Sequence, residues 1–259
     1  TIAAGVAKAG AQVVLISGYD GGTGAAPASS IHNAGLPWEL GVAEAHKTLI
    51  REGLRSRIVL ETDGKLMSGR DVAIAAMLGA EEFGFATAPL VTMGCVMMRV
   101  CNLDTCPVGV ATQNPALRCR FRGKPEYVMN FMNYIAEELR EIMAKLGIRT
   151  VNELVGRSDL LYVREKPDSK ASSVSLSCLL SQKPGAEAMH FEPDKVYDFH
   201  LENTLDESVL LKKFASSLKT GKPQTVSLSV SSTNRTLGTI LGSEITRRFG
   251  QSLPDDTFT

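Results

Sequence analysis

The chain has 259 residues, of which 28 are basic, 28 are acidic and 44 % are hydrophobic. This length is enough for one or two domains with sizeable cores, and a net charge of zero gives no electrostatic reason to expect nucleic acid or an anionic membrane as a partner. No apolar run approaches the roughly 20 residues that span a bilayer, and residues 1–15 lack the order of a signal peptide. We therefore expect a soluble, cytoplasmic protein that binds neither nucleic acid nor membrane.

The first third of the chain alternates apolar runs with segments of helical spacing. Short continuous apolar runs are typical of strands in a parallel sheet, where helices cover the faces. Strand, helix, strand, helix and strand with short loops predict consecutive βα units of a parallel sheet or barrel. The expected strands are residues 11–17, 58–63 and 82–87, and the expected helices are residues 37–54 and a helix beginning at Gly69, capped by Ser68 with Asp71.

The strongest helical pattern begins at Pro125, and Gly147 is expected to end it. Thr150 and Glu153 have the spacing of a capping box for a short helix. Residues 157–200 lose all periodicity and are interpreted as a connection over the surface. Beyond them we expect a helix over residues 206–218, a half-buried strand with Val226, Leu228 and Val230 on one face, and a final helix with Leu237, Ile240, Leu241 and Ile245.

Three of the five cysteines, Cys95, Cys101 and Cys106, follow a C-x5-C-x4-C spacing with glycine and proline nearby. Thiolates that bind iron need a chain that bends around the metal, which favours such neighbours. Three thiolates suit a cluster that lacks one corner iron, whereas a cubane or a closed zinc site needs four ligands. The same cysteines also fit small buried hydrophobes, so the spacing alone leaves both interpretations open. A fourth ligand could come from Cys119, His32 or His46.

Glycines follow the predicted strands. Asp63 and Gly64 precede the helix at Gly69, and Gly84 lies in the third strand, so these turns can direct amide hydrogens at an anion. In barrels with phosphorylated cofactors, the phosphate sits at the last two strand–helix loops. Ordinary tight turns explain the same glycines. The glycine loop of residues 20–24 is no Walker motif, and we expect its backbone to approach a flat ligand or a substrate.

Four segments of this sequence closely resemble the synthase part of the glutamate synthases. The resemblance runs from Thr1 to about Leu161 and is weak over about residues 162–205. Thr233–Glu244 is similar to the entry into the family's C-terminal glycine-repeat β-helix. The four segments are Ile16–Pro27, Leu36–Gly41, Thr62–Asp71 and Cys101–Gln113.

The resemblance implies an α/β fold in three parts. Residues 1–160 would be the C-terminal portion of a (β/α)8 TIM barrel, residues 161–205 a helical or irregular connection, and residues 206–259 the start of a β-rich C-terminal domain. A complete barrel needs about 250 residues. Because the sequence begins in mid-domain without Met, we expect a fragment, and we do not interpret Thr1 as a catalytic N-terminal residue.

The resemblance also implies two cofactors. A 3Fe-4S cluster would be bound by Cys95, Cys101 and Cys106, next to FMN. Cys119 and Cys178 lie outside the cluster pattern and are expected to be spare thiols, and His32 and His46 to be loop and helix-surface residues. The residues expected to contact FMN are Ser17, Gly21, Gly22, Thr23, Asp63, Gly64, Gly84, Phe85 and Ala86.

The implied activity is synthesis of L-glutamate. Ammonia released from glutamine by an amidotransferase domain reacts with 2-oxoglutarate, and the imine takes a hydride from reduced FMN. Electrons would arrive through iron-sulfur centres from NAD(P)H, by way of a small subunit or domain, or from ferredoxin. No catalytic residue is assigned, and a plant-type member would be in the plastid. An inosine monophosphate dehydrogenase-like barrel without iron and a noncatalytic fragment remain alternatives.

Overall fold

The computed structural model describes residues 2–19, 29, 33–164, 170–181 and 190–259. The chain divides into two compact units, residues 1–197 and residues 198–259. We describe each unit by itself.

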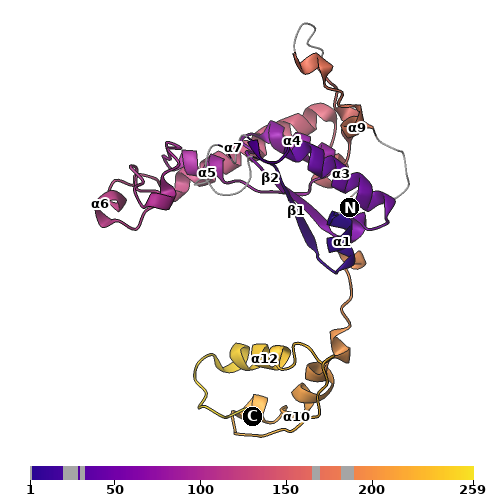
Figure 1. Ribbon diagram of the computed structural model, residues 1–259, viewed down its shortest axis with the longest axis vertical. Coiled ribbons are helices and arrows are strands. Elements are labelled where there is room, and N and C mark those ends of the chain that lie inside the picture. Colours follow the sequence, from indigo (N-terminus) through magenta and orange to yellow (C-terminus); the bar gives the residue numbers. More distant parts are fainter. Residues whose placement is uncertain (1, 20–28, 30–32, 165–169, 182–189) are drawn as a thin grey trace. The chain divides into compact units, whose positions relative to one another are not determined.

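The first unit is built on a small parallel sheet in the order β1-β2-β3 (Figure 1). Parallel neighbours need a crossover, and helices supply it in both cases. The mixed α/β class and the parallel βα units predicted from the sequence are therefore confirmed. The elements are β1 Val13–Ser17, α3 Trp38–Arg51, β2 Val59–Asp63, α4 Gly69–Leu78 and β3 Glu82–Phe83.

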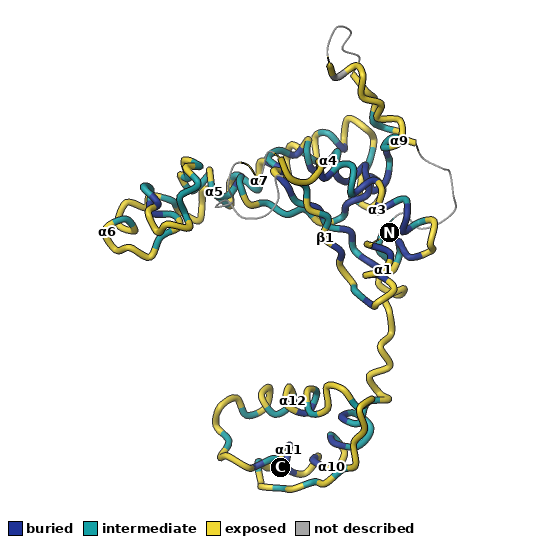
Figure 2. The backbone as a smooth tube through the Cα atoms, viewed as in Figure 1, coloured by how far each residue is buried: buried dark blue, intermediate teal, exposed yellow. Residues whose placement is uncertain are grey.

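One face of this sheet is covered by the helices. Because side chains alternate along a strand, Leu60 and Thr62 of β2 face the helices and are fully buried. On the other face, Val13 and Leu15 of β1 are 45 % and 48 % exposed. Among the described residues, the sheet therefore has one packed face and one open face, and the burial of residues along β1 is coloured in Figure 2.

β3 is shorter than the predicted strand over residues 82–87. The backbone N–H of Gly84 still donates to the carbonyl oxygen of Thr62 at 2.8 Å. The chain then turns into α5 (Thr87–Thr92), so residues that alternation assigned to the strand lead into a helix instead. Gly84 to Ala86 form a strand-to-helix turn.

Two predicted helices pack against each other with very little space between them. α4 has the predicted capping box of Ser68 and Asp71, and α7 (Pro125–Leu146) begins and ends where the sequence predicted. A methyl group added at Gly69 would lie 2.6 Å from the carbonyl oxygen of Ile135. Glycine thus allows the first turn of α4 to approach the α7 backbone.

A buried arginine ties the unit together. The Arg55 side chain is 1 % exposed and forms an ion pair with Glu81 at 2.7 Å. Its other donors reach Nδ1 of His46 at 3.0 Å, the carbonyl oxygen of Ile58 at 2.9 Å and that of Gly79 at 3.0 Å. The network joins α3, the segment before β2 and the segment before β3.

His46 is buried, so the expectation that it lies on a helix surface was wrong. The reason is Gly79, where an added methyl group would lie 2.3 Å from Cγ of the His46 ring. The His46 imidazole occupies the space that a side chain at residue 79 would need. Burial, with the charges of Arg55 and Lys47, lowers the pKa of His46 from 6.5 to about 3.

We expect this histidine to make the unit less stable in mild acid. Between pH 6.5 and about pH 3, the unfolded chain binds a proton at His46 that the folded chain does not. The contribution of neutral His46 to the free energy of unfolding is therefore fully present above pH 6.5. It decreases as the pH is lowered, by roughly 1.5–2 kcal/mol at about pH 5. Hydrogen exchange of the β2 amides in the full-length enzyme, corrected for intrinsic rates, measures the loss.

The matched variant is His46→Gln, which keeps an acceptor for Arg55 and removes the titration. Its β2 amides should keep nearly constant protection over the same pH range. Equal pH slopes in the wild type and in His46→Gln would contradict the assignment.

The segment that follows α7 packs against α3 and α4. α8 (Val151–Leu154) is capped by Thr150 as predicted, and η3, η4 and α9 follow. Farther along, the backbone N–H of Phe191 donates to Oε1 of Glu81 at 2.5 Å. The bounds of the remaining elements are α1 Ile2–Lys8, η1 Arg55–Arg57, η2 Cys101–Leu103, α6 Pro115–Arg118, η3 Ser158–Leu160, η4 Lys170–Ser173, α9 Ser177–Leu180 and η5 Pro193–Lys195.

The second unit is a small helical cluster. The helix predicted over residues 206–218 is divided into a π-helical turn and two short α-helical pieces, yet Leu210, Phe214 and Leu218 are buried together with Leu241. Asp206 accepts hydrogen bonds from the backbone of Gly238 at 2.7 Å and of Ile240 at 2.8 Å. The elements are η6 Leu201–Asn203, η7 Asp206–Leu210, α10 Leu211–Lys213, α11 Ser217–Thr220 and α12 Thr239–Phe249.

The strand predicted around Val226, Leu228 and Val230 is absent from the described residues. In the second unit, the described pairing of this segment is one isolated bridge, between Gln224 and Phe258, and it ends where the backbone N–H of Val226 donates to the carbonyl oxygen of Thr259 at 2.7 Å. Val226 and Leu228 pack against the helical cluster instead. The β-rich C-terminal domain stays a prediction. No described helix has the length and apolar character needed to cross a membrane.

Candidate functional site

The carboxyl ends of the three strands bring several predicted cofactor residues together. Ser17 and Asp63 are register partners at the ends of β1 and β2. The backbone N–H of Gly18 donates to the carbonyl oxygen of Asp63 at 3.2 Å, and Gly84 follows β3. The carboxyl edge of a parallel sheet is where ligands bind in such folds. Gly21, Gly22 and Thr23, and also His32, lie outside the described residues.

Asp63 has a buried carboxylate oxygen that lacks a partner. Oδ1 of Asp63 is buried and has no hydrogen-bond partner among the described residues. Next to it, a methyl group added at Gly84 would lie 2.8 Å from Cβ of Asp63. A buried acceptor without a donor is costly, and a glycine beside it leaves the backbone accessible. These features fit a polar ligand at this edge.

The N-terminus of α4, which follows the turn at Gly64, is not open to an anion. Oε2 of Glu138 accepts a hydrogen bond from the Gly69 backbone N–H at 2.7 Å. Ser68 and Asp71 satisfy further amides of the first turn. The first turn of α5, which follows Gly84–Ala86, has no side-chain cap. An anion at this edge would therefore meet the turn of residues 84–86 rather than α4.

A cavity of about 320 Å³ lies between the ends of β1 and β2. Trp38 forms one wall, and a methyl group added at Gly18 would lie 2.8 Å from its backbone nitrogen. Gly64 has φ of +121°, a conformation that favours glycine. The cavity is lined by Gly18, Tyr19, Pro37, Trp38, Glu39, Gly64, Lys65, Leu66 and Asp71.

The cysteine loop, residues 94–114, follows α5. Its backbone enters the left-handed region repeatedly, at φ of +55° for Met97, +58° for Arg99 and +56° for Asp104. Hydrogen bonds to Asp104 close the loop: Oγ1 of Thr112 donates to Oδ1 at 2.6 Å, and the backbone N–H of Gln113 donates at 2.7 Å. Turns of this kind expose successive amides on a concave side, as in many phosphate and iron-sulfur sites.

Cys106 lies in such a concavity. Burial raises the pKa of its thiol, but hydrogen bonds from four backbone amides outweigh burial, so the pKa lies below its ordinary value. The thiolate is the form that binds metal. The loop thus stabilises the charge that a cluster ligand needs. The four amides belong to Ala111, Val108, Val110 and Gly109.

The other two cysteines lie at the two sides of the loop. Cys95 is half-buried, and its Sγ accepts a hydrogen bond from the backbone of Met97 at 3.4 Å. Cys101 is half-buried in η2. Among the described residues, these cysteines do not form a trio with all ligand atoms within 4.8 Å of one another. Three sulfur atoms that are not all this close do not suit a single metal ion, whereas an iron-sulfur cluster binds each thiolate through a different iron.

Two of the three candidate fourth ligands, His46 and Cys119, have other partners, and the third, His32, lies outside the described residues. Nδ1 of His46 is engaged by Arg55. Cys119 is exposed, and its Sγ donates to the carbonyl oxygen of Ala116 at 3.1 Å. Cys178 is exposed on α9. Among the described residues, the donor set of the loop is therefore its own three thiols, which fits a three-iron cluster, whereas a closed zinc site needs four ligands.

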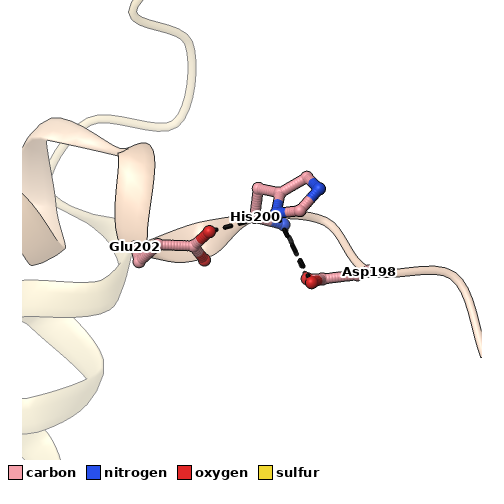
Figure 3. Close-up of side chains that lie close together, drawn as sticks. All are labelled: Asp198, His200 and Glu202. Carbon is pink, nitrogen blue, oxygen red and sulfur yellow. Dashed lines mark hydrogen bonds and ion pairs between the residues drawn. The ribbon is translucent and has the colours of Figure 1, made fainter. Parts of the chain in front are cut away.

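A second group of possible metal ligands lies in the second unit. Asp198, His200 and Glu202 point toward one another, with Nδ1 of His200 3.0 Å from Oε1 of Glu202 and 3.4 Å from Oδ2 of Asp198 (Figure 3). All three are exposed. Glu202 already hydrogen-bonds the ring, and Asp198 accepts a hydrogen bond from the His200 backbone N–H, so we assign no metal to this group.

Several residues of the site were not found from the sequence. Trp38 walls the cavity, Glu138 blocks the α4 N-terminus, and the amides after Cys106 form its concavity. Glu138 lies on α7, far from α4 in the sequence. The residue types do not indicate where backbone amides will point. In the sequence, only the Pro-Trp pair at residues 37–38 indicated part of this site.

Comparison with known proteins gives a consistent result. Residues 1–149 match the family model described as a conserved region in glutamate synthase. The chain is 56 % identical to the large chain of the NADPH glutamate synthase of Bacillus subtilis over 99 % of its length. It is also 51 % identical, over 99 % of its length, to the NADH glutamate synthase of Schizosaccharomyces pombe.

A third relative is ferredoxin-dependent glutamate synthase 2 of Synechocystis, which is 44 % identical over 97 % of the chain. The chain spans 17 %, 12 % and 16 % of these three relatives, respectively. The names of these relatives state different electron donors, yet each relative aligns with nearly the whole of this chain.

Proposed function

This chain belongs to the glutamate synthase family, and from that premise we propose that it supplies the FMN edge and the iron-sulfur loop of a glutamate synthase. The whole enzyme would convert glutamine and 2-oxoglutarate, with two electrons and two protons, into two molecules of L-glutamate. Residues 1–160 would form the last βα units of a (β/α)8 barrel, with the open face of β1 turned to the barrel interior.

FMN would bind at the carboxyl ends of the three strands. Asp63 offers an unpartnered acceptor for a ligand N–H, and Gly64 lets the backbone approach the flavin. The phosphate would meet the turn of Gly84, Phe85 and Ala86, since α5 lacks a side-chain cap. Ser17 and the loop of Gly21, Gly22 and Thr23 would lie near the ring or the substrate. Bound FMN supplies hydride transfer, and these residues orient it.

Cys95, Cys101 and Cys106 would bind a 3Fe-4S cluster that passes electrons to the flavin. The observation that carries this proposal is that one loop, residues 94–114, holds three thiols, of which that of Cys106 is buried. An inosine monophosphate dehydrogenase-like enzyme would need one nucleophilic cysteine and would have no use for three thiols in one loop. A noncatalytic fragment would not need three thiols in one loop either.

The names of the relatives support electron delivery from NADPH, NADH or ferredoxin, and the choice for this enzyme belongs to parts outside the chain. Residues 161–205 would be the connection, and residues 206–259 the start of the β-helix domain. We place the enzyme in the cytoplasm, or in the plastid of a plant-type organism.

The experiment is an isotope transfer in the full-length enzyme under anaerobic conditions. With dithionite, 2-oxoglutarate and glutamine carrying nitrogen-15 in its amide, the label should appear in the α-amino group of newly formed glutamate. The control omits dithionite and should give only unlabelled glutamate from hydrolysis of glutamine. Label that remains in free ammonia with dithionite present would contradict the proposed reaction.

A further inference from the structure

Trp38 is the only tryptophan of the chain, and it is buried at the carboxyl edge of the sheet. It begins α3 directly after Pro37, and it lines the cavity between the ends of β1 and β2. The residue is 8 % exposed and belongs to the core of the first unit. Its indole N–H has no hydrogen-bond partner among the described residues, so packing alone holds the ring in place.

The indole ring packs against two glycine turns. A methyl group added at Gly18 would lie 3.2 Å from Cδ1 of Trp38, and one added at Gly64 would lie 3.3 Å from the same atom. The methyl group at Gly64 would also lie 3.2 Å from the backbone nitrogen of Gly18. The indole and the two turns therefore meet at one point, where each of them limits the position of the other two.

Both turns adjoin residues of the proposed FMN edge. Gly18 directly follows Ser17, and Gly64 directly follows Asp63. The Gly18 backbone N–H donates to the carbonyl oxygen of Asp63 at 3.2 Å, so a shift of either turn would also move Asp63. The cavity beside them has a volume of about 320 Å³. A smaller side chain at residue 38 would enlarge this space and let the turns move into it.

From this packing we infer that Trp38 is a positioning residue for FMN. The inference rests on the proposed function of the strand ends. The indole acts through Gly18 and Gly64, because these turns fix the backbone and the Asp63 carboxylate against which the flavin would lie. A site that is ordered before its ligand arrives avoids the entropic cost of ordering on binding, and it keeps the reacting groups in productive geometry.

The test compares variants of Trp38 in the full-length enzyme. Trp38→Ala removes the ring, whereas Trp38→Phe keeps an aromatic ring between the two turns. Trp38→Leu leaves a smaller gap than Trp38→Ala, and it takes the place of Trp38→Ala if that variant does not fold.

The matched control is Leu49→Ala. Leu49 is fully buried on the same helix, about 16 Å along α3 from Trp38. Both alanine variants remove a large buried side chain, so both should lower the hydrogen-exchange protection of the β2 amides. This common loss is the structural effect, and the binding of FMN separates the two variants.

The main readout is the FMN dissociation constant, measured by equilibrium dialysis with the absorption of free flavin. Trp38→Ala should raise it by about tenfold or more, because the two turns must be ordered again when FMN binds. Leu49→Ala should stay within about twofold of the wild type and Trp38→Phe within about threefold. At saturating FMN, Trp38→Ala should also lower kcat for dithionite-driven glutamate formation by about 10–100-fold.

Equal FMN affinities in Trp38→Ala and Leu49→Ala would overturn the inference, because Trp38 would then only support the fold. A loss in Trp38→Phe as large as that in Trp38→Ala would assign the indole N–H as a direct donor to the ligand, and this result would overturn it as well. If the wild-type enzyme holds no FMN, the proposed function itself fails, and the inference falls with it.

Discussion

Arg55→Ala should destabilise the first unit by about 3–5 kcal/mol, because it leaves the carboxylate of Glu81 buried without its partner. The Arg55 side chain is 1 % exposed and that of Glu81 11 % exposed, so water cannot replace the lost guanidinium. The carbonyl oxygens of Ile58 and Gly79 lose donors as well. Hydrogen exchange of the β2 amides in the full-length enzyme measures the opening free energy locally, which suits a large enzyme that does not unfold in two states.

Arg57→Ala is the matched control, since Arg57 lies in the same short helix and is exposed. It should change the protection of β2 by less than about 0.5 kcal/mol. The double variant Arg55→Met with Glu81→Leu should recover most of the loss, because it removes both charges together. If Arg55→Ala and Arg57→Ala behave alike, the buried pair does not have the role assigned to it.

Cys106→Ser should abolish electron flow to 2-oxoglutarate in the full-length enzyme. A serine hydroxyl is not ionised at neutral pH and does not replace a thiolate, so the cluster would lose a ligand. Because even changes around metal ligands cost about 10–100-fold, loss of a ligand should lower donor-driven glutamate formation by about 100-fold or more. Iron content should fall in parallel, and chromatography of the glutamate formed measures the rate.

Cys119→Ser is the control for this prediction. Its thiol is exposed and bonds only the carbonyl oxygen of Ala116 among the described residues, so iron and activity should stay near wild-type levels. Retained flavin absorption in Cys106→Ser would exclude general unfolding as the cause of lost activity. Full iron content in Cys106→Ser would contradict its assignment as a ligand.

Local signals predicted the parts of the fold that depend on neighbouring residues. Pro125 and Gly147 bound α7 because one supplies a fixed φ and the other adopts φ of +73°. Ser68 and Asp71 predicted the start of α4, because both hydrogen bonds of the capping box lie within one turn. The short strands β1 and β2 were evident from continuous apolar runs.

The failures concern residues whose state depends on distant segments. His46 is buried because Gly79 makes room for its ring, which no pattern within α3 reveals. The alternation at Val226 and Leu228 predicts a strand, but a strand also needs a neighbour, and these side chains pack on helices instead. The turn at Gly64 leads into α4, whose first amide, at Gly69, is occupied by Glu138, a residue of another helix.

The candidate site could be predicted in outline only. The three cysteines and the turns at Asp63 and Gly84 were evident from spacing and glycine. The amides around Cys106 and the unpartnered Oδ1 of Asp63 depend on how the backbone folds, which residue types do not encode.

The most direct measurement is electron paramagnetic resonance of the oxidised full-length enzyme, isolated anaerobically and assayed for iron and sulfide. The account predicts the spectrum of a three-iron centre with three iron and four sulfide ions per FMN in that sample. A preparation that makes glutamate at its full rate with no iron, or with iron that stays when all three loop thiols are replaced by serine, would contradict it.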